Sequence, residues 1–472
     1  MGQTNGGIAQ SAAVPVVDTC HLTPSEFRFL QEALLVAENS ATAIVELPAF
    51  LACFPPHLRP LVQPLFFLLD KSAPQDAEGS LGPKPDASWP GLVAGLSRLV
   101  HDGGASWALL LEAWGGSSSS STSPAEVHGA SERAKAGAEL GLVLCFWCAH
   151  GTLLPQPGMP EGCPSSAVAA AVHGSELDPV ESILSALWPS DPIEAASLLE
   201  SPDRIRARLT EFAPCLPRSI APKFSQVLLG NPMEREWPEI DTRILDTGSA
   251  FLLRGIDARL WSSHDWHPLY CDWRDGRAFS AFLKGVLHYP GVAVLLLRLS
   301  RTNGVLGAIS SSWEEGRGKY SGGSDNVLFA LRPCLQVLRT SGRGSNFFYL
   351  NSRNKHAPRG IGFGGQPECS RLWLDADFEQ CQVMQSDATY KAGMLLADSK
   401  DFQERERIAA IEVWGCAGPE ALQRQAEDRD REEGIRQNER KVDRSRMVES
   451  QFDREMFFGK TFAHSEEKAA DT

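Results

Sequence analysis

The sequence has few basic residues for its length and no long apolar run. Its 472 residues include 45 Lys and Arg against 59 Asp and Glu, which gives a net charge of -14. Nucleic-acid binding needs clustered Lys and Arg, so this balance argues against a nucleic-acid partner. No apolar stretch approaches the about 20 residues that span a bilayer, and the first residues lack the basic and apolar segments of a signal peptide. We therefore expect a cytosolic protein.

Catalytic and metal-binding patterns are also scarce. No Gly-x-Ser-x-Gly elbow accompanies His264, Asp265 and His267, so these residues do not indicate a hydrolase. Eleven cysteines, an odd number without framework spacing, favour reduced thiols. Cys145 and Cys148 have the Cys-x-x-Cys spacing inside an apolar run, and two interpretations stay open: buried core thiols, which we favour, or a redox pair. We expect neither a metal nor a cofactor.

The first half is predicted to form helices with interruptions. Thr23-Pro-Ser-Glu26 resembles a capping box with Pro24 at the first helical position. Helical spacing of apolar residues predicts further helices over residues 61–69, 92–111, 179–187 and 192–212. Segments rich in Pro, Gly or Ser predict loops over residues 72–90, 115–124 and 155–179.

The pattern changes to short strands after residue 250. Residues 292–299 are apolar and β-branched, and Asn303-Gly304 favours a tight hairpin turn with positive φ at both positions before residues 305–311 return. Further strands are predicted over residues 327–331, 335–338, 347–350, 371–378 and 408–413. Short strands separated by turn residues are typical of antiparallel sandwiches. The fold class is therefore α+β, with a helical N-terminal half, an antiparallel β-sandwich with flanking helices, and an extended C-terminal helix.

A glycine cluster lies near the middle of this β-rich region. Gly360, Gly362 and Gly365 fit the dinucleotide fingerprint Gly-x-Gly-x-x-Gly, but that motif requires a preceding strand and a following helix. The flanking residues predict neither element. We favour a glycine-rich turn where backbones approach closely.

Three acidic residues are candidates for catalytic groups. Strand alternation places Asp375 with Trp373 and Asp377 on the more polar face, where no His or Cys supplies metal-ligand spacing. Glu412, between Ile411 and Val413, is either a general base or the partner of an arginine, and the arginine pair is the commoner arrangement.

These motifs together resemble the signature of the TLDc family. The resemblance is carried by Arg359-Gly-Ile-Gly-Phe-Gly-Gly-Gln-Pro-Glu-Cys-Ser-Arg-Leu-Trp-Leu-Asp-Ala-Asp-Phe378 and Ile408-Ala-Ala-Ile-Glu-Val-Trp-Gly415, and it extends over residues 250–418. It implies a mainly architectural role for the signature positions Gly364, Gly365, Trp373, Asp375, Glu412 and Trp414. It also implies a protein that is not an enzyme.

The N-terminus resembles an N-myristoylation signal. Gly2 would be the acceptor after removal of Met1, although Gly6 stands where Ser or Thr is preferred. An ordinary flexible start is the other interpretation. One myristoyl chain gives only marginal membrane affinity, and no Lys or Arg precedes Arg28, so stable residence at a membrane surface would need a protein partner.

The C-terminal segment, residues 419–472, is predicted to be a charged helix with an aromatic tail. Acid-first i,i+4 pairs such as Glu427 with Arg431 support a helix, and residues 427–446 have no apolar stripe to pack on their own domain. The candidate partner-binding residues are Ile435, Val442, Val448, Phe452, Met456 and Phe457. The alternative is that the tail folds back onto its own chain.

The segments expected along the chain are a flexible start (1–22), a helical region (23–153), a middle helical region (175–230), the TLDc-like domain (250–418) and the C-terminal segment (419–472). The resemblance is greatest to the subgroup with an N-myristoylation signal, an EF-hand-like helical region and a C-terminal helix, which includes an mTOR-associated animal regulator and plant and algal relatives. The region 23–153 matches its EF-hand-like part in outline, without an Asp-x-Asp-x-Asp-Gly calcium loop.

The resemblance implies a regulator of the vacuolar proton-pumping ATPase. The TLDc domain and the C-terminal helix would contact subunits of its peripheral sector, with the protein in the cytoplasm at the lysosomal or vacuolar membrane and linked to TOR signalling or oxidative-stress resistance. Two alternatives remain: a redox-protective protein that acts through Cys145 and Cys148, and a signalling scaffold independent of the pump.

Overall fold

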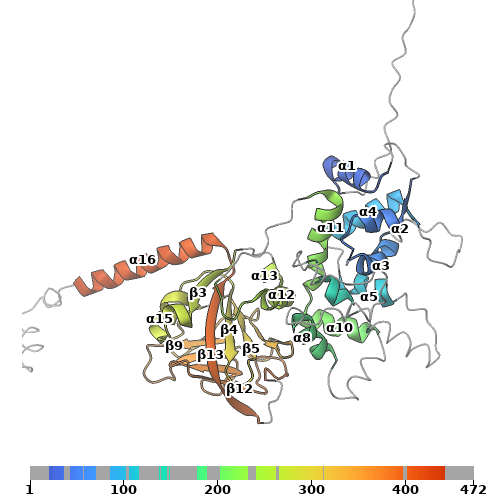
Figure 1. Ribbon diagram of the computed structural model, residues 1–472. Helices are drawn as coiled ribbons and strands as arrows, with labels where there is room; N and C mark the ends of the chain where they lie inside the picture. The colour runs from blue at the N-terminus through green and yellow to red at the C-terminus, as the bar shows by residue number, and fades with distance from the viewer. Residues whose placement is uncertain are drawn as a thin grey trace, which may run out of the picture.

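The computed structural model describes residues 21–36, 43–56, 58–70, 86–101, 106–115, 135, 138, 140–145, 148, 178–188, 202–231, 241–261, 265–311, 313–396 and 401–441. A helical half is followed by a β-rich half, and one long helix ends the described chain (Figure 1). This arrangement confirms the α+β class expected from the sequence. The expected acylation site, Gly2, lies outside the described residues.

Helices form the N-terminal half, and two of them follow short strands that pair with each other. The helices are α1 (Pro24–Ala33), α2 (Leu47–Ala52), α3 (Arg59–Asp70), α4 (Trp89–Val100), α5 (Trp107–Gly115), α8 (Asp178–Leu187), α10 (Pro202–Phe212), the 3-10 helix η2 (Leu216–Ser219) and α11 (Ile220–Leu229). Strand β1 (Ile44–Glu46) precedes α2, and β2 (Asp86–Ser88) precedes α4. The two strands pair antiparallel, so a helix–strand–helix unit occurs twice.

The capping box predicted at the start of α1 is present. The Glu26 backbone N–H donates to Thr23 Oγ1 over 3.3 Å, and the Thr23 backbone N–H donates to Glu26 Oε2 over 2.7 Å. The buried Glu26 also accepts from Asn231 Nδ2 at 2.6 Å, beyond the end of α11. One carboxylate therefore starts α1 and ties it to a helix about 200 residues later in the chain.

The β-rich half is an antiparallel sheet folded into two facing layers. Its strands are β3 (His267–Cys271), β4 (Ala293–Leu299), β5 (Val305–Ser310), β6 (Tyr320–Ser321), β7 (Val327–Arg332), β8 (Gln336–Arg339), β9 (Phe348–Asn351), β10 (Gly360–Phe363), β11 (Leu372–Asp375), β12 (Gln380–Met384) and β13 (Gln403–Gly415). The order is β6-β9-β10-β11-β12-β13-β4-β5-β7-β8, with β3 also paired to β13. Its helices are α12 (Thr247–Ile256), α13 (Ala258–Trp261), α14 (Asp272–Asp275), α15 (Phe279–Val286) and α16 (Pro419–Lys441).

Strand β13 belongs to both layers. Its first half pairs with β12 and its second half with β4 and β3, and the register shifts between Ile408 and Ala410. Buried side chains of the two layers, such as Leu297 on β4 and Leu374 on β11, share one core. This shared core makes the β-rich half a sandwich.

Helix α8 of the N-terminal half and helix α12 cover the outer face of one layer. Val294 and Leu296 on β4 are fully buried in the same core as residues of α8 and α12. In addition, the Leu335 backbone N–H donates to the Ser182 carbonyl at 3.0 Å, and α8 lies against this layer in Figure 1. Strand β4 is therefore buried on both faces along most of its length, which suits its mainly apolar sequence.

Several expected boundaries were wrong. The helix expected over residues 92–111 is two helices, α4 and α5, and the loop expected over 72–90 contains β2 and the start of α4. The strand expected over 371–378 ends at Asp375, whereas β13 begins five residues before Ile408. In the hairpin turn only Asn303 has positive φ (51°), while Gly304 does not. The glycines at 360 and 362 lie in strand β10, so the turn begins at Gly364.

Replacing Leu296 with alanine should destabilise the helical half and the sandwich together. Its side chain is fully buried in the core that both halves share, and a buried Leu→Ala change costs about 2–5 kcal/mol of unfolding free energy. Urea unfolding followed by circular dichroism measures the loss. Leu35→Ala is the control, because Leu35 is 88 % exposed and should change stability by less than about 0.5 kcal/mol. Equal, small effects of both changes would contradict the shared core.

Candidate functional site

The paired glycines of the signature make a tight turn after β10. Gly364 and Gly365 have φ of +71° and +58°, a conformation that other residues rarely adopt. A side chain at Gly364 would meet Asp387 Oδ2 at 2.6 Å, and one at Gly365 would meet the Cys369 carbonyl at 2.3 Å. Asp387 also accepts from the Gly365 backbone N–H at 3.2 Å. The turn is thus packed against its own chain.

Strand β10 forms a flat surface for the indole of Trp373. A Cβ at Gly360 or Gly362 would lie 2.8 Å from the Trp373 ring, and the ring packs 5.6 Å from that of Tyr349. The indole Nε1 donates to Asp375 Oδ1 at 2.6 Å, so Trp373 and Asp375 lie on one face as alternation predicted. These glycines lie within β10 and a turn follows it, so the helix that a pyrophosphate site requires does not follow.

Glu412 on β13 is a buried carboxylate with four donors. Its Oε2 accepts from Thr242 Oγ1 at 2.7 Å and from Trp414 Nε1 at 3.0 Å. Its Oε1 accepts from the backbone N–H groups of Arg243 (2.6 Å) and Ile244 (3.2 Å). The expected pairing with an arginine side chain was wrong, because backbone and neutral donors already satisfy both oxygens. Glu412 and Trp414 anchor the segment that leads into α12.

The thiols of Cys145 and Cys148 are buried in the helical half. Burial raises the pKa of both, that of Cys148 to about 12. Because the thiolate is the reactive form, burial opposes redox chemistry at this pair. In the ranges that the structure describes, no group of three or more His, Cys, Asp or Glu is placed to hold a metal ion. None of the described helices has both the length and the apolar character needed to cross a membrane.

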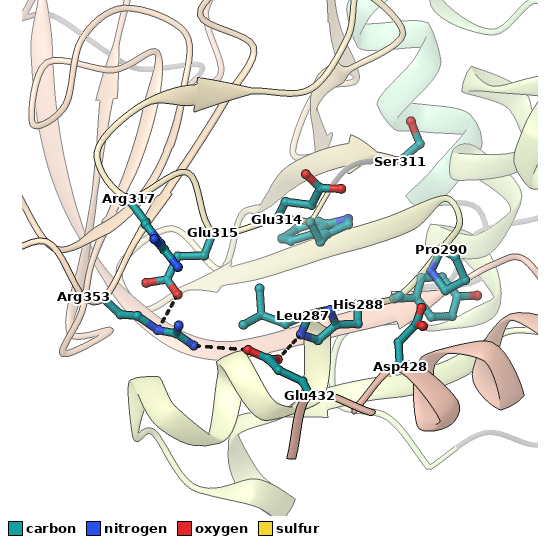
Figure 2. Close-up of a pocket in the computed structure, with 12 residues that line it drawn as sticks. Leu287, His288, Pro290, Ser311, Glu314, Glu315, Arg317, Arg353, Asp428 and Glu432 are labelled. Carbon is teal, nitrogen blue, oxygen red and sulfur yellow. Dashed lines mark ion pairs between the residues drawn. The ribbon is translucent and has the colours of Figure 1, made fainter. Parts of the chain in front are cut away.

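A cleft lies between the middle of α16 and the sandwich (Figure 2). Its volume is about 420 Å³, and its walls come from the α15–β4 connection, the segment after β5, the loop after β9 and α16 itself. The residues that line it include Trp313, Glu314, Glu315, Arg317, Asp428 and Leu287.

Charged groups connect α16 to the opposite wall of this cleft. Glu432 lies 2.8 Å from His288 Nε2 and 3.8 Å from Arg353 Nη2, and Arg353 also pairs with Glu315 at 3.0 Å. Burial acts to raise the pKa of Glu432, but hydrogen bonds and ion pairs from Arg436 and His288 outweigh it and lower that pKa. The contacts of Glu432 therefore stabilise the folded chain at pH values above the ordinary carboxyl pKa. This stabilisation is lost as the pH falls through the lowered pKa of Glu432.

The comparisons with known proteins are consistent with this architecture. Residues 240–417 match the family model described as "TLDc domain". This part of the chain is a TLDc domain. The chain is 32 % identical over 155 residues to "MTOR-associated protein MEAK7" of Danio rerio, covering 32 % of this chain and 33 % of that protein. The Homo sapiens protein of the same name is 30 % identical over 159 residues, 33 % of each chain.

A fungal protein is similar over a shorter part. "Restriction of telomere capping protein 5" of Neurospora crassa is 32 % identical over 127 residues, which is 22 % of this chain and 21 % of that protein. The matched segments of the first relatives span about a third of their length. The family match starts at residue 240, ten residues before the start expected from the motifs, and it includes Thr242 and Arg243, which bind Glu412.

The candidate tail residues are only partly described. Ile435 lies on α16 and is 53 % exposed, whereas Val442, Val448, Phe452, Met456 and Phe457 lie outside the described residues. The TLDc signature positions fall at three places: the Gly364–Gly365 turn, the Trp373–Asp375 face and the Glu412–Trp414 anchor. Sequence reasoning missed Thr242, Asp387, His288 and Arg353, because their partners are distant in the chain.

Replacing Glu412 with glutamine should destabilise the TLDc domain. The amide has one acceptor oxygen for the four donors, and its NH2 group would face a donor, so the expected loss is about 1–3 kcal/mol. Chemical denaturation of the full chain measures it. Glu379→Gln is the matched control, since Glu379 is exposed and should be neutral. A loss no larger than that of the control would show that the anchor is dispensable.

Peroxide consumption by the purified protein should not depend on Cys145 and Cys148. Burial keeps both thiols protonated, so the double Cys→Ser variant should consume hydrogen peroxide at the wild-type rate. The exposed Cys369 serves as a positive control for thiol labelling with Ellman's reagent. A large, cysteine-dependent rate lost in the double variant would favour the redox interpretation instead.

Proposed function

We propose that this chain is a non-enzymatic regulator that binds the peripheral sector of the vacuolar proton-pumping ATPase. The TLDc domain and α16 would form the binding surfaces, with the chain in the cytoplasm against the lysosomal or vacuolar membrane. The proposal rests on the family resemblance of the TLDc domain together with one structural observation: α16 leaves the domain as a charged helix with an exposed far half.

The exposed half of α16 supports a partner-binding role. Ile435 is a large apolar side chain that is half exposed, and the neighbouring described residues Glu433 and Gln437 are exposed. A helix without an apolar stripe gains little from packing on its own domain. Such a helix is suited to bridge to another protein, and Ile435 would be an anchor on it.

The signature residues support a regulator rather than a catalyst. Gly364, Trp373 and Glu412 are each occupied by contacts within the chain. A catalytic carboxylate needs access to a substrate atom, whereas Glu412 is fully buried with both oxygens satisfied. We infer that these residues act by holding the shape of the TLDc domain.

A second candidate is a signalling scaffold that acts without the pump. It is favoured by the relatives whose names describe association with mTOR. In both cases the chain acts through protein contacts and is linked to growth signalling. Acylation at Gly2, where it occurs, would add a weak membrane signal that a protein partner completes.

Affinity purification from native membranes tests pump binding. A C-terminal tag leaves Gly2 free, and the full chain is compared with a chain ending at Gly418 by mass spectrometry of co-purified subunits. Strong recovery of pump subunits with the full chain, reduced by the truncation, is the expected result. Absence of pump subunits from both samples, with TOR-pathway proteins recovered, would favour the scaffold.

Three point variants refine the same experiment. Ile435→Ser removes the exposed apolar anchor and should reduce recovery, whereas Glu433→Gln, two positions earlier on the same exposed segment, should leave it unchanged. Gly2→Ala should reduce the membrane-bound fraction without abolishing recovery from solubilised membranes. If Ile435→Ser binds as well as wild type, the described part of α16 is not the contact.

A further inference from the structure

The start of α16 is held firmly by the domain. The Ala417 backbone N–H donates to the hydroxyl of the buried Tyr289 at 2.8 Å, and the Cys416 N–H donates to the Val292 carbonyl at 2.8 Å. Gly418, with φ of +77°, then turns the chain into α16 and has open space around it. Gly418 has this conformational freedom and directly follows two residues that are held by hydrogen bonds, so it is placed to act as a pivot.

The next contacts of α16 are mainly polar. Gln425 Nε2 donates to the carbonyls of Gly285 (3.1 Å) and Leu287 (2.9 Å), and Arg429 donates to Gly285 at 2.9 Å. These carbonyls end α15, where a helix has no partners of its own for its last carbonyls. The apolar contribution within the described helix is small: Ala421 and Leu422 reach the sandwich core. Water could replace most of these contacts.

Glu432 makes the outermost contact between α16 and the domain. It reaches across the cleft to His288 and Arg353, as the dashed lines in Figure 2 show. These groups are each a third or more exposed, and exposed ion pairs hold surfaces together weakly. Beyond Glu432, the side chains of Arg436 and Gln437 contact residues of the same helix, Glu432 and Glu433.

We propose that α16 is a releasable arm that pivots at Gly418 between this docked position and an undocked one, and that the Glu432 contact to His288 and Arg353 sets the balance. The charged groups that face Glu432 are His288, Arg353 and, within the helix, Arg436, with Glu315 and Asp428 beside them. A partner that binds the exposed part of α16 better in one position would shift the balance toward it. The inference concerns the isolated chain and does not rest on pump binding.

Trypsin cleavage after Arg424 reports the undocked arm. Arg424 is exposed, but the following residue, Gln425, is buried against the α15 carbonyls, so cleavage requires undocking and local opening. Glu432→Gln should raise the cleavage rate on the order of threefold, the effect of losing a weak surface pair. The site lies eight residues from the change, so the protease does not read the substitution directly. Glu433→Gln is the matched control and should cut at the wild-type rate.

Variants on the domain side separate undocking from helix fraying. His288→Asn shortens the side chain, and Asn tolerates the positive φ of 64° at this position. It should raise the cleavage rate as Glu432→Gln does, without altering the helix. Arg436→Gln removes only the intrahelical partner of Glu432 and should have a smaller effect. Thermal unfolding verifies that each variant remains folded.

Hydrogen exchange of the α16 amides provides a second readout. Faster exchange around residues 425–429 in Glu432→Gln and His288→Asn, with unchanged exchange in the sandwich, is the expected result. Equal cleavage and exchange for Glu432→Gln and Glu433→Gln would overturn the proposal. Faster cleavage and exchange in Arg436→Gln that His288→Asn does not reproduce would also overturn it, because that result indicates fraying of a helix that stays docked.

Discussion

The buried carboxylate of Glu412 is the constraint on which the arrangement of both halves depends. It lies on β13, the strand shared by the two layers, and its four donors include the backbone of residues 243 and 244. A buried charge is costly unless hydrogen bonds satisfy it, and bonds to an ionised group are the stronger ones. This carboxylate therefore selects one path for the chain into α12, and α12 brings the helical core onto the outer face of β4.

Earlier on β13, Arg277 binds the shared strand at its register shift. The register shifts between Ile408 and Ala410, and there Arg277 donates to the carbonyls of Ile408 (3.2 Å) and Ala409 (2.6 Å). Arg277 is itself paired with Asp272 at 2.9 Å. Strand β13 serves both layers and then leads the chain to Gly418. The attachment of α16 is thus set by the same strand that closes the sandwich.

Local signals in the sequence predicted the elements whose causes are local. The predicted capping box at Thr23 and Glu26 and the predicted strand at β4 are both confirmed. In each case the signal comes from residues that are neighbours in the sequence. The first half of β13 was missed because Gln403-Glu-Arg-Glu-Arg407 is polar throughout, and its pairing with β12 comes from a partner strand. The arginine expected for Glu412 was wrong for a related reason: three of its four donors lie about 170 residues earlier, where no local pattern marks them.

The signature residues of the TLDc domain and the residues that hold α16 against it lie at different places in the structure. The glycine turn and the Trp373 face pack against the chain itself. A substitution there therefore changes the shape of the domain and affects contacts with a partner only through that shape. His288, Arg353 and Glu432 belong to no recognised motif, yet they determine where α16 points. Since the described helix has little apolar surface to hold it, its direction follows from a few exchangeable polar contacts. The core of the domain can then stay unchanged while substitutions at these three positions change the direction of α16.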